Sequence, residues 1–361
     1  MEKVDTIIIG GGLSGIYAAF LLAEKIESLV VLEARSRIGG RIASPAHEDF
    51  FADLGPSWYW PLMNPRINAL VQNLGLKGYP QFETGLGRFQ TRDGQAGTVD
   101  GCPMYPPGWR LEGGMIALVQ ALRDRIPQNI IRLNHPVCRI ERLPDGVAVA
   151  VGHLDQEPAY RLQASRIILA LPPRLAARSI LFTPDLSPDL TQAMLKTDTW
   201  MAGQAKFFAL YDQADWRELG FSGQGFSLRG PLGEIHDGSS PAGSPYGLTG
   251  FVGIPARRRK SREVMIPAIL DQLTRLYGET ASKPVEVYYK DWATEAFTAT
   301  EYDLRAAHNH PEFQPPSGKT STWNGAIHFA GSETADELGG YLEGALSSAE
   351  RAVSGIITNL A

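Results

Sequence analysis

The stretch VDTIIIGGGLSGIYAAFLLAEK, residues 4–25, has the pattern of a dinucleotide-binding turn between a strand and a helix. Its first part, residues 4–9, ends in three isoleucines and predicts a buried strand, whereas residues 13–25 predict a helix. Glycines with the spacing G-x-G-x-x-G lie between the two elements. The stretch therefore predicts the first βα unit of a nucleotide-binding α/β domain.

The residues of this turn have different physical tasks. Gly10 permits a tight turn, Gly12 lets the backbone approach a pyrophosphate, and Gly15 lets the helix pack closely against the strand. Leu13 and Ser14 begin the helix, whose N-terminal N–H groups and dipole would face the phosphates. We predict that these five residues form the phosphate-binding part of a cofactor site.

An acidic residue at the end of the next strand supports the same interpretation. Residues 28–33, SLVVLE, predict a strand that ends in Glu33, about 20 residues after the glycines. A carboxylate at this position would bind a ribose diol and repel a 2′-phosphate, which disfavours NADP. Paired glycines and arginines then suit a second backbone approach to the cofactor, and the predicted contacts are Ala34, Arg35, Gly39, Gly40 and Arg41.

Composition is that of an ordinary globular protein. The chain has 361 residues, 43% of them hydrophobic and 20% charged, which is enough for two domains with a sizeable core. Its net charge of −5 gives no electrostatic reason to expect nucleic acid or an anionic membrane surface. The one notable basic run, residues 257–260, suits a solvated loop or helix start better than a binding patch.

Targeting and cysteine signals favour the cytoplasm. The chain begins directly in the first predicted strand, and no run of 18 apolar residues occurs, so we expect neither a signal peptide nor a membrane anchor. Cys102 and Cys138 lack CxxC spacing and a nearby ligand cluster. We therefore expect no disulfide framework, no zinc site and a reducing compartment.

Periodicity along the rest of the chain predicts a mixed α/β protein. Further helices are predicted at residues 67–75, 115–125 and 262–277. Strands are predicted at 136–140 with 146–151 as a hairpin, at 165–171 before Pro172 and Pro173, and at 204–211. Residues 78–109 are rich in glycine, proline and aromatic residues and predict short strands and loops.

A second glycine-rich region lies near the other end of the chain. Residues 331–335, GSETA, and 339–345, GGYLEGA, open an amphipathic segment that continues to the C-terminus. Together with the first turn, this region resembles the flavin-containing amine oxidase family, within the flavoproteins that have two dinucleotide-binding domains. The residues that carry the resemblance span nearly the whole chain, namely 10–15, 33, 39–41, 53–57, 113–114, 206, 331–335 and 340–345.

The resemblance implies that the cofactor is FAD. Glu333 and the backbone of Gly331 and Ser332 would contact its ribityl–phosphate region, and the Leu342 N–H would face the flavin N1/O2 edge. Reduction places negative charge at that edge, where a helix N-terminus stabilises it at little cost in reorganisation. The remaining predicted cofactor contacts are Gly55, Pro56, Ser57, Trp58 and Val137.

The resemblance also implies the domain organisation. A Rossmann-like α/β FAD-binding domain would be built from the discontinuous segments 1–77, 110–175 and 292–361. An α+β substrate-binding domain would be built from residues 78–109 and 176–291.

Three residues are candidates for a catalytic role. Lys206 lies in an apolar strand similar to the family strand whose lysine holds a water against flavin N5, although it could instead point to solvent on an alternating strand. Tyr341 matches one wall of the family's aromatic cage, and Tyr302 matches the other less closely. Two parallel phenol rings would guide an amine in its neutral form, although either tyrosine could be an ordinary interface aromatic.

The chain departs from the family in two ways. Members with covalent flavin carry a cysteine just before the position of Tyr302, where this chain has Glu301, so we expect a non-covalent flavin. Many relatives insert a long helical lobe between the positions of Trp58 and Gly113, where only about fifty residues remain here. The site would then be more open, or roofed by residues 78–109 or by a second subunit of a homo-oligomer.

The predicted function is FAD-dependent oxidation of a small-molecule amine. Hydride transfer from the α-carbon to flavin N5 would give an imine that hydrolyses, and oxygen or another acceptor would reoxidise the flavin. One alternative is an amino-acid oxidase, for which Arg229 or Arg305 could bind the carboxylate, or another oxidase or desaturase on the same scaffold. The other alternative is an FAD-binding assembly protein with little turnover.

A histidine pair and one glutamate are weaker candidates for functional residues. His308 and His310 could be read as a metal pair, but no supporting Cys or acidic cluster follows, so a polar loop is favoured and no metal site is predicted. Glu343 is interpreted as structural, although a carboxylate near the flavin could tune its potential.

Overall fold

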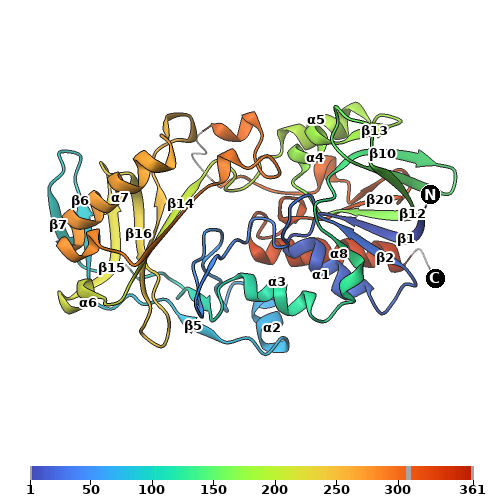
Figure 1. The fold of residues 1–361 in the computed structure, drawn as a ribbon. Coiled ribbons are helices and arrows are strands. Elements are labelled where there is room, and N and C mark those ends of the chain that lie inside the picture. Colours follow the sequence, from blue (N-terminus) through green and yellow to red (C-terminus); the bar gives the residue numbers. More distant parts are fainter. Residues whose placement is uncertain (1, 102, 306–309, 359–361) are drawn as a thin grey trace.

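Two large β-sheets organise the fold and lie at opposite ends of the molecule (Figure 1). The computed structural model describes residues 2–101, 103–305 and 310–358. Within these residues, one sheet has nine strands and a parallel centre, and the other has seven strands and is mostly antiparallel. This arrangement confirms the predicted fold class, a Rossmann-like α/β unit built from discontinuous segments together with an α+β unit.

The parallel centre of the first sheet grows from the first predicted strand. β1 (Glu2–Ile9) pairs with β2 (Leu29–Leu32) on one side and with β12 (Tyr160–Leu169) on the other. β9 (Ile131–Arg132) continues the sheet beyond β2, and β20 (Ile327–Phe329) pairs with the last residues of β12. The carboxyl ends of these parallel strands share one edge, which is where α/β proteins bind ligands.

The predicted hairpin extends this sheet on the β12 side. β10 (Val137–Leu143) and β11 (Gly146–Val151) pair antiparallel, and β11 pairs antiparallel with the first half of β12. This pairing explains why β12 begins at Tyr160, earlier than predicted. The short strands β13 (Leu181–Thr183) and β19 (Ser321–Thr322) pair with β10 and β20 respectively.

Helices cover both faces of the parallel strands (Figure 1). One face carries α1 (Leu13–Leu22), α2 (Pro65–Asn73), α3 (Ile116–Arg123) and α8 (Leu342–Ile357). The other face carries α4 (Pro173–Ser179) and α5 (Pro188–Lys196). Ile8 packs beneath the first group, and Ile7 and Ile9 beneath the second. A strand buried on both faces needs apolar residues at successive positions, which explains the isoleucine run.

The second sheet packs against one long helix, α7 (Arg262–Tyr277), which forms at the residues predicted for it. β14 (Ala205–Tyr211) is buried along its whole length. Its alternate residues pack in two directions, with Phe207 towards α7 and Phe208 towards Phe50 and Leu54. The strand order is β18 (Glu286–Asp291), β14, β17 (Tyr246–Val252), β16 (Leu232–Asp237), β15 (Phe221–Ser227), β6 (Leu86–Gln90) and β7 (Ala96–Val99).

Residues 78–109 form short strands and loops, as predicted, and β6 and β7 among them extend the second sheet. The remaining elements are β3 (Ala46–His47), β4 (Phe50–Phe51), β5 (Gly78–Pro80), β8 (Trp109–Leu111) and α6 (Asp215–Glu218). Of the helices in the described part of the chain, none combines the length and apolar character needed to cross a bilayer.

We expect Gly15→Ala to lower the free energy of unfolding by about 2–4 kcal/mol. A Cβ on Gly15 would lie 1.9 Å from the Gly10 carbonyl oxygen, a backbone atom that cannot move without opening the turn. Urea unfolding followed by tryptophan fluorescence measures the change. Gly97→Ala is the matched control, because a Cβ there meets no atom within 4 Å. Equal stability of the two variants would contradict the expectation.

Candidate functional site

One cavity is lined by residues from both ends of the chain and from the second sheet. Most of the predicted cofactor and catalytic residues line it, namely Gly10, Gly12, Leu13, Ser14, Glu33, Arg35, Gly39, Gly40, Arg41, Gly55, Pro56, Ser57, Trp58, Lys206, Gly331, Ser332, Tyr341 and Leu342. The fold thus brings together glycine-rich segments that are more than 300 residues apart in the sequence.

A hydrogen bond joins the two glycine-rich segments. The Gly331 N–H donates to Ser14 Oγ at 3.0 Å, and Ser14 Oγ lies 3.5 Å from Ser348 Oγ on α8. Ser14 is on α1, which packs along α8. The first turn and the last helix are therefore held on the same wall of the cavity.

Glycine backbones face each other beside the first turn. The Gly39 N–H donates to the Gly11 carbonyl at 2.8 Å. Gly40 has a φ of +58°, and a Cβ on it would lie 3.2 Å from the Gly12 Cα. Side chains are absent from both glycine segments, so a phosphate group can approach backbone N–H groups closely. This part of the cavity fits the pyrophosphate of a dinucleotide.

Glu33 is held by the backbone around it. The side chain is buried, and its carboxylate accepts the N–H of Gly11 at 2.7 Å and the N–H of Arg35 at 2.8 Å. The Arg35 guanidinium in turn donates to Thr298 Oγ1 at 2.6 Å. Glu33 lines the cavity while Ala34 beside it does not, so a fixed acceptor stands where a ribose is expected.

The N-terminus of α8 opens onto the cavity. Leu342 and Ala345 line it, and Tyr341, the N-cap residue, provides no side-chain cap for the first-turn N–H groups. The positive end of this helix is therefore available to negative charge in the cavity. Glu343 points elsewhere, since its carboxylate accepts the backbone N–H groups of Arg66 and Ile67, both at 3.0 Å, at the start of α2. This geometry supports a structural role for Glu343.

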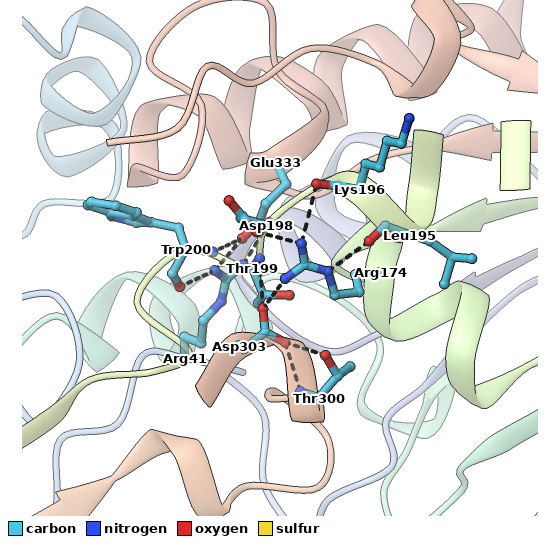
Figure 2. Close-up of polar contacts among 10 residues, drawn as sticks. All are labelled: Arg41, Arg174, Leu195, Lys196, Asp198, Thr199, Trp200, Thr300, Asp303 and Glu333. Carbon is cyan, nitrogen blue, oxygen red and sulfur yellow. Dashed lines mark hydrogen bonds and ion pairs between the residues drawn. The ribbon is translucent and has the colours of Figure 1, made fainter. Parts of the chain in front are cut away.

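Glu333 faces away from the cavity, contrary to the predicted contact with the ribityl chain. It is fully buried, and Figure 2 shows its carboxylate between Arg41 and the backbone of Trp200. It accepts hydrogen bonds from Arg41 Nη2 at 2.9 Å, Ser332 Oγ at 2.9 Å and the Trp200 N–H at 3.1 Å. Burial opposes the charged form, but Arg41 and Ser332 outweigh it and hold the pKa of Glu333 below its usual value. Glu333 thus positions Arg41, which does line the cavity.

Lys206 is buried, so the solvent-facing alternative is wrong. Its ammonium donates to the Gly55 carbonyl at 2.9 Å and to Ser57 Oγ. It also lies 5.4 Å from the ring centre of Trp58 and 5.0 Å from that of Phe251. All five residues line the cavity or its edge, so the lysine stands at an aromatic wall.

The surroundings of Lys206 lower the pKa of its ammonium group. Burial lowers the pKa of Lys206 to about 7, partly offset by the carboxylate of Asp53 and reinforced by the guanidinium of Arg110. Asp53 and Arg110 are themselves buried as a pair, with Arg110 Nη2 3.7 Å from Asp53 Oδ2. The lysine can therefore exist in either protonation state near neutral pH.

The two predicted cage tyrosines are not in the same cavity. Tyr341 lines the cofactor cavity, and its ring stacks on His310 with centroids 4.9 Å apart. Tyr302 does not line it and lies under the Arg178 guanidinium, 4.7 Å from its ring centre. Phe297 occupies the cavity wall instead. The predicted cage wall at Tyr302 is therefore corrected.

The backbone around Tyr302 explains this placement. Residues 301–304 form a 3₁₀ turn, and Asp303 accepts the N–H of Thr300 at 2.8 Å. Asp303 Oδ1 also accepts a hydrogen bond from buried Arg174 at 2.6 Å. This anchored turn directs Asp303 inwards and leaves Tyr302 40% exposed.

Several other predicted site residues lie outside the cofactor cavity. Gly15, Ala34 and Val137 do not line the cavity. Neither arginine proposed for a substrate carboxylate lines it, since Arg229 bonds the Asp93 carbonyl at 2.7 Å and Arg305 lines a second cavity. His308 lies outside the described residues. The described part of the chain contains no group of three His, Cys, Asp or Glu side chains placed to hold a metal.

Several lining residues were not predicted. They are Ile42, Leu54, Trp60, Asn64, Ala170, Leu171, Pro172, Met201, Gln204, Phe251, Trp292, Phe297, Thr298, Gly340 and Ala345. A sequence signal existed for Ala170, Leu171 and Pro172, which follow the central strand β12 at the edge where α/β proteins bind ligands.

The cavity wall near the missing lobe comes from the loop after Ser57. Trp58, Trp60 and Asn64 line the cavity, whereas no described residue between 78 and 109 does. Gly108 packs behind the two tryptophans, since a Cβ on it would lie 3.4 Å from Trp58 and 3.6 Å from Trp60. Residues 78–109 therefore support this wall from outside the cavity.

Comparisons with known proteins agree with this geometry. A model of NAD(P)-binding Rossmann-like domains matches residues 8–74, and the model of the flavin containing amine oxidoreductases matches residues 86–357. The chain is 24% identical to the probable flavin-containing monoamine oxidase A of Dictyostelium discoideum over an alignment of 449 positions, which covers 96% of each protein. It is also 24% identical to the putrescine oxidase of Kocuria rosea, covering 98% of this chain and 95% of that protein.

Solved structures with the same fold include two amine oxidases. Cyclohexylamine oxidase from Brevibacterium oxydans superposes with a TM-score of 0.83 at 21% identity over 99% of both chains. Wild-type putrescine oxidase bound to putrescine superposes with a TM-score of 0.79 at 22% identity, again over 99% of both chains. The alignment with the Dictyostelium protein is 449 positions long, which exceeds the 361 residues of this chain, so that relative carries segments that are missing here.

We expect Lys206→Met to flatten the pH dependence of stability. The pKa of Lys206 is lowered from 10.5 to about 7, so the unfolded chain binds a proton that the folded protein loses. The buried lysine therefore lowers the free energy of unfolding, and this destabilisation is complete below pH 7 and disappears as the pH rises towards 10.5. Between pH 7 and 9 the free energy of unfolding should rise about 2 kcal/mol more in the unsubstituted protein than in the variant.

Urea unfolding at several pH values measures this difference. Lys77→Met is the control, because the Lys77 side chain is 79% exposed and its removal should leave the slope unchanged. Identical slopes for Lys206→Met and the unsubstituted protein would contradict the expectation.

Proposed function

The chain belongs to the flavin containing amine oxidoreductase family, and we propose that its cavity holds FAD non-covalently with the amine bound beside Tyr341 and Lys206. The protein is an FAD-dependent oxidoreductase that acts on the carbon–nitrogen bond of an amine. The observation that carries the site assignment is the convergence of the first turn, the α8 N-terminus and Lys206 on one cavity.

The cavity residues fit FAD part by part. The facing glycines Gly12 and Gly40 would admit the pyrophosphate, and Glu33 would bind the ribose. The α8 N-terminus at Leu342 would lie against the flavin ring. When bound, FAD supplies the chemistry by accepting a hydride equivalent from the α-carbon of the amine.

The chain's own residues would select the neutral amine. The rings of Trp58 and Phe251 lie beside Lys206, and Tyr341 lines the same cavity. A protonated Lys206 would repel an ammonium ion, whereas an uncharged amine meets apolar ring surface. Since the lone pair must be free for oxidation, excluding the ammonium form favours the reactive species.

No described residue that lines the cofactor cavity carries a thiol, which supports a non-covalent flavin. Position 301, where covalent relatives have cysteine, is glutamate, and the turn that contains it faces a different cavity. Cys138 is buried in β10 and does not line the cofactor cavity. Oxygen or another acceptor would reoxidise the flavin, and a homo-oligomer in which a second subunit roofs the cavity remains a prediction. A cytoplasmic location remains a prediction.

Anaerobic flavin bleaching across a panel of amines tests the function. At least one amine should reduce the bound FAD, and admission of oxygen or an added acceptor should restore the yellow colour. Lys206→Met should lower the rate of reduction or reoxidation at least about ten-fold, because a preorganised cation is lost. Lys77→Met is the control. Unchanged rates in Lys206→Met would refute the role of the lysine, and an unbleached flavin would refute amine oxidation.

Release of the cofactor tests its mode of attachment. Denaturation in acid followed by ultrafiltration should leave all FAD absorbance in the filtrate, because no cysteine lies at position 301. Flavin absorbance that stays with the precipitated protein would show a covalent bond.

A further inference from the structure

A second cavity adjoins the cofactor cavity. Met201 and Gln204, which precede β14, line both cavities, so the two share a wall. The other walls of the second cavity come from residues 252–256, after β17, and from the anchored turn that contains Tyr302. No predicted role accounts for this space.

Stacked aromatic rings connect the two cavities. Tyr341 lines the cofactor cavity, whereas Trp200 and His310 line the second one. The ring of His310 lies 4.9 Å from that of Tyr341 and 4.2 Å from that of Trp200, centroid to centroid. A ligand that starts against Tyr341 therefore meets a continuous aromatic surface leading towards the second cavity.

The buried ionic groups of the second cavity are already satisfied. Figure 2 shows Arg174 at the centre of a network in which it bonds Asp303, Asp198 and the carbonyls of Leu195 and Lys196. Asp303 is also occupied, since it accepts hydrogen bonds from Thr300 besides that of Arg174. This network shapes the cavity and engages all three guanidinium nitrogens of Arg174 with protein oxygens.

Arg305 differs from Arg174. It lines the second cavity, is exposed, and makes no ion pair within the described part of the chain. Exposed Arg257 and Arg258 follow directly after Ala256, another lining residue, and likewise have no carboxylate partner among the described residues. Arg305 is thus an unpaired arginine in the lining of this cavity, whereas the other lining arginine, Arg174, is paired with Asp198 and Asp303. An unpaired guanidinium at a cavity attracts an anionic group.

We propose that the second cavity binds a carboxylate at the far end of the amine substrate, with Arg305 as its main contact. The amine would lie against Tyr341 in the cofactor cavity, and the chain between the two groups would pass Met201 and Gln204. The inference rests on the proposed function and narrows the substrate class to amines that carry a distal carboxylate.

Matched substrate pairs test the proposal on the holoenzyme. The ω-aminocarboxylates from 4-aminobutanoate to 8-aminooctanoate are compared with n-alkylamines of the same length in anaerobic flavin reduction. One chain length should bind at least about ten-fold more tightly than its alkylamine, the effect of one charge-assisted hydrogen bond. Arg305→Gln should remove this advantage through KM while leaving kcat and the alkylamine kinetics unchanged, and Arg305→Lys should keep part of it.

A readout independent of turnover separates this inference from the proposed function. Octanoate, which has no amine to oxidise, should raise the Tm of the holoenzyme, and Arg305→Gln should abolish the shift. Arg229→Gln is the matched control, since Arg229 is exposed, donates to the Asp93 carbonyl and does not line this cavity. The carboxylate site alone would be overturned if the alkylamines reduced the flavin and no ω-aminocarboxylate bound more tightly than its alkylamine. It would also be overturned if octanoate raised the Tm of Arg305→Gln as much as that of the unsubstituted holoenzyme. Failure of every amine to reduce the flavin would overturn the proposed function instead.

Discussion

The rest of the site depends on the contact between the two ends of the chain. Gly331 donates its N–H to Ser14 Oγ, and α1 packs along α8. Through this contact a turn that is suited to phosphate and a helix N-terminus that is suited to a reduced ring face the same cavity. Neither segment alone specifies a flavin site, because the first could hold any dinucleotide and the second could be any helix.

The buried charged residues divide into those that hold the structure together and one that is suited to chemistry. Glu333 with Arg41, and Asp303 with Arg174, are ion pairs in which a buried carboxylate is held by several hydrogen bonds. Such pairs tie segments together and give them one geometry. Lys206 is different, because burial lowers its pKa to about 7 and its direct hydrogen-bond partners are neutral oxygens. A lysine near its titration point beside an aromatic wall suits chemistry better than structure.

Much of the fold could be predicted because its signals are local. The isoleucine run of β1, the hairpin of β10 and β11, and the helix α7 all depend on periodicity within one segment. Predictions of side-chain direction were less successful. Glu333 was expected at the ribityl chain, but the proximity of Arg41 turns it away from the cavity. Tyr302 was expected beside Tyr341, but the Arg174–Asp303 pair fixes its turn in another orientation.

The amino-acid sequence by itself determined the dinucleotide-binding unit, the flavin family and the residues of the first turn, because glycine spacing and strand periodicity are properties of neighbouring residues. Only the tertiary structure decided which side chains share a cavity. Lys206 is buried because β14 is covered on both faces, and Arg305 lies at a second cavity because a distant ion pair anchors its turn. Such placements depend on contacts between residues far apart in the sequence, 151 positions for Lys206 and Gly55 and 129 for Arg174 and Asp303, which no local pattern encodes.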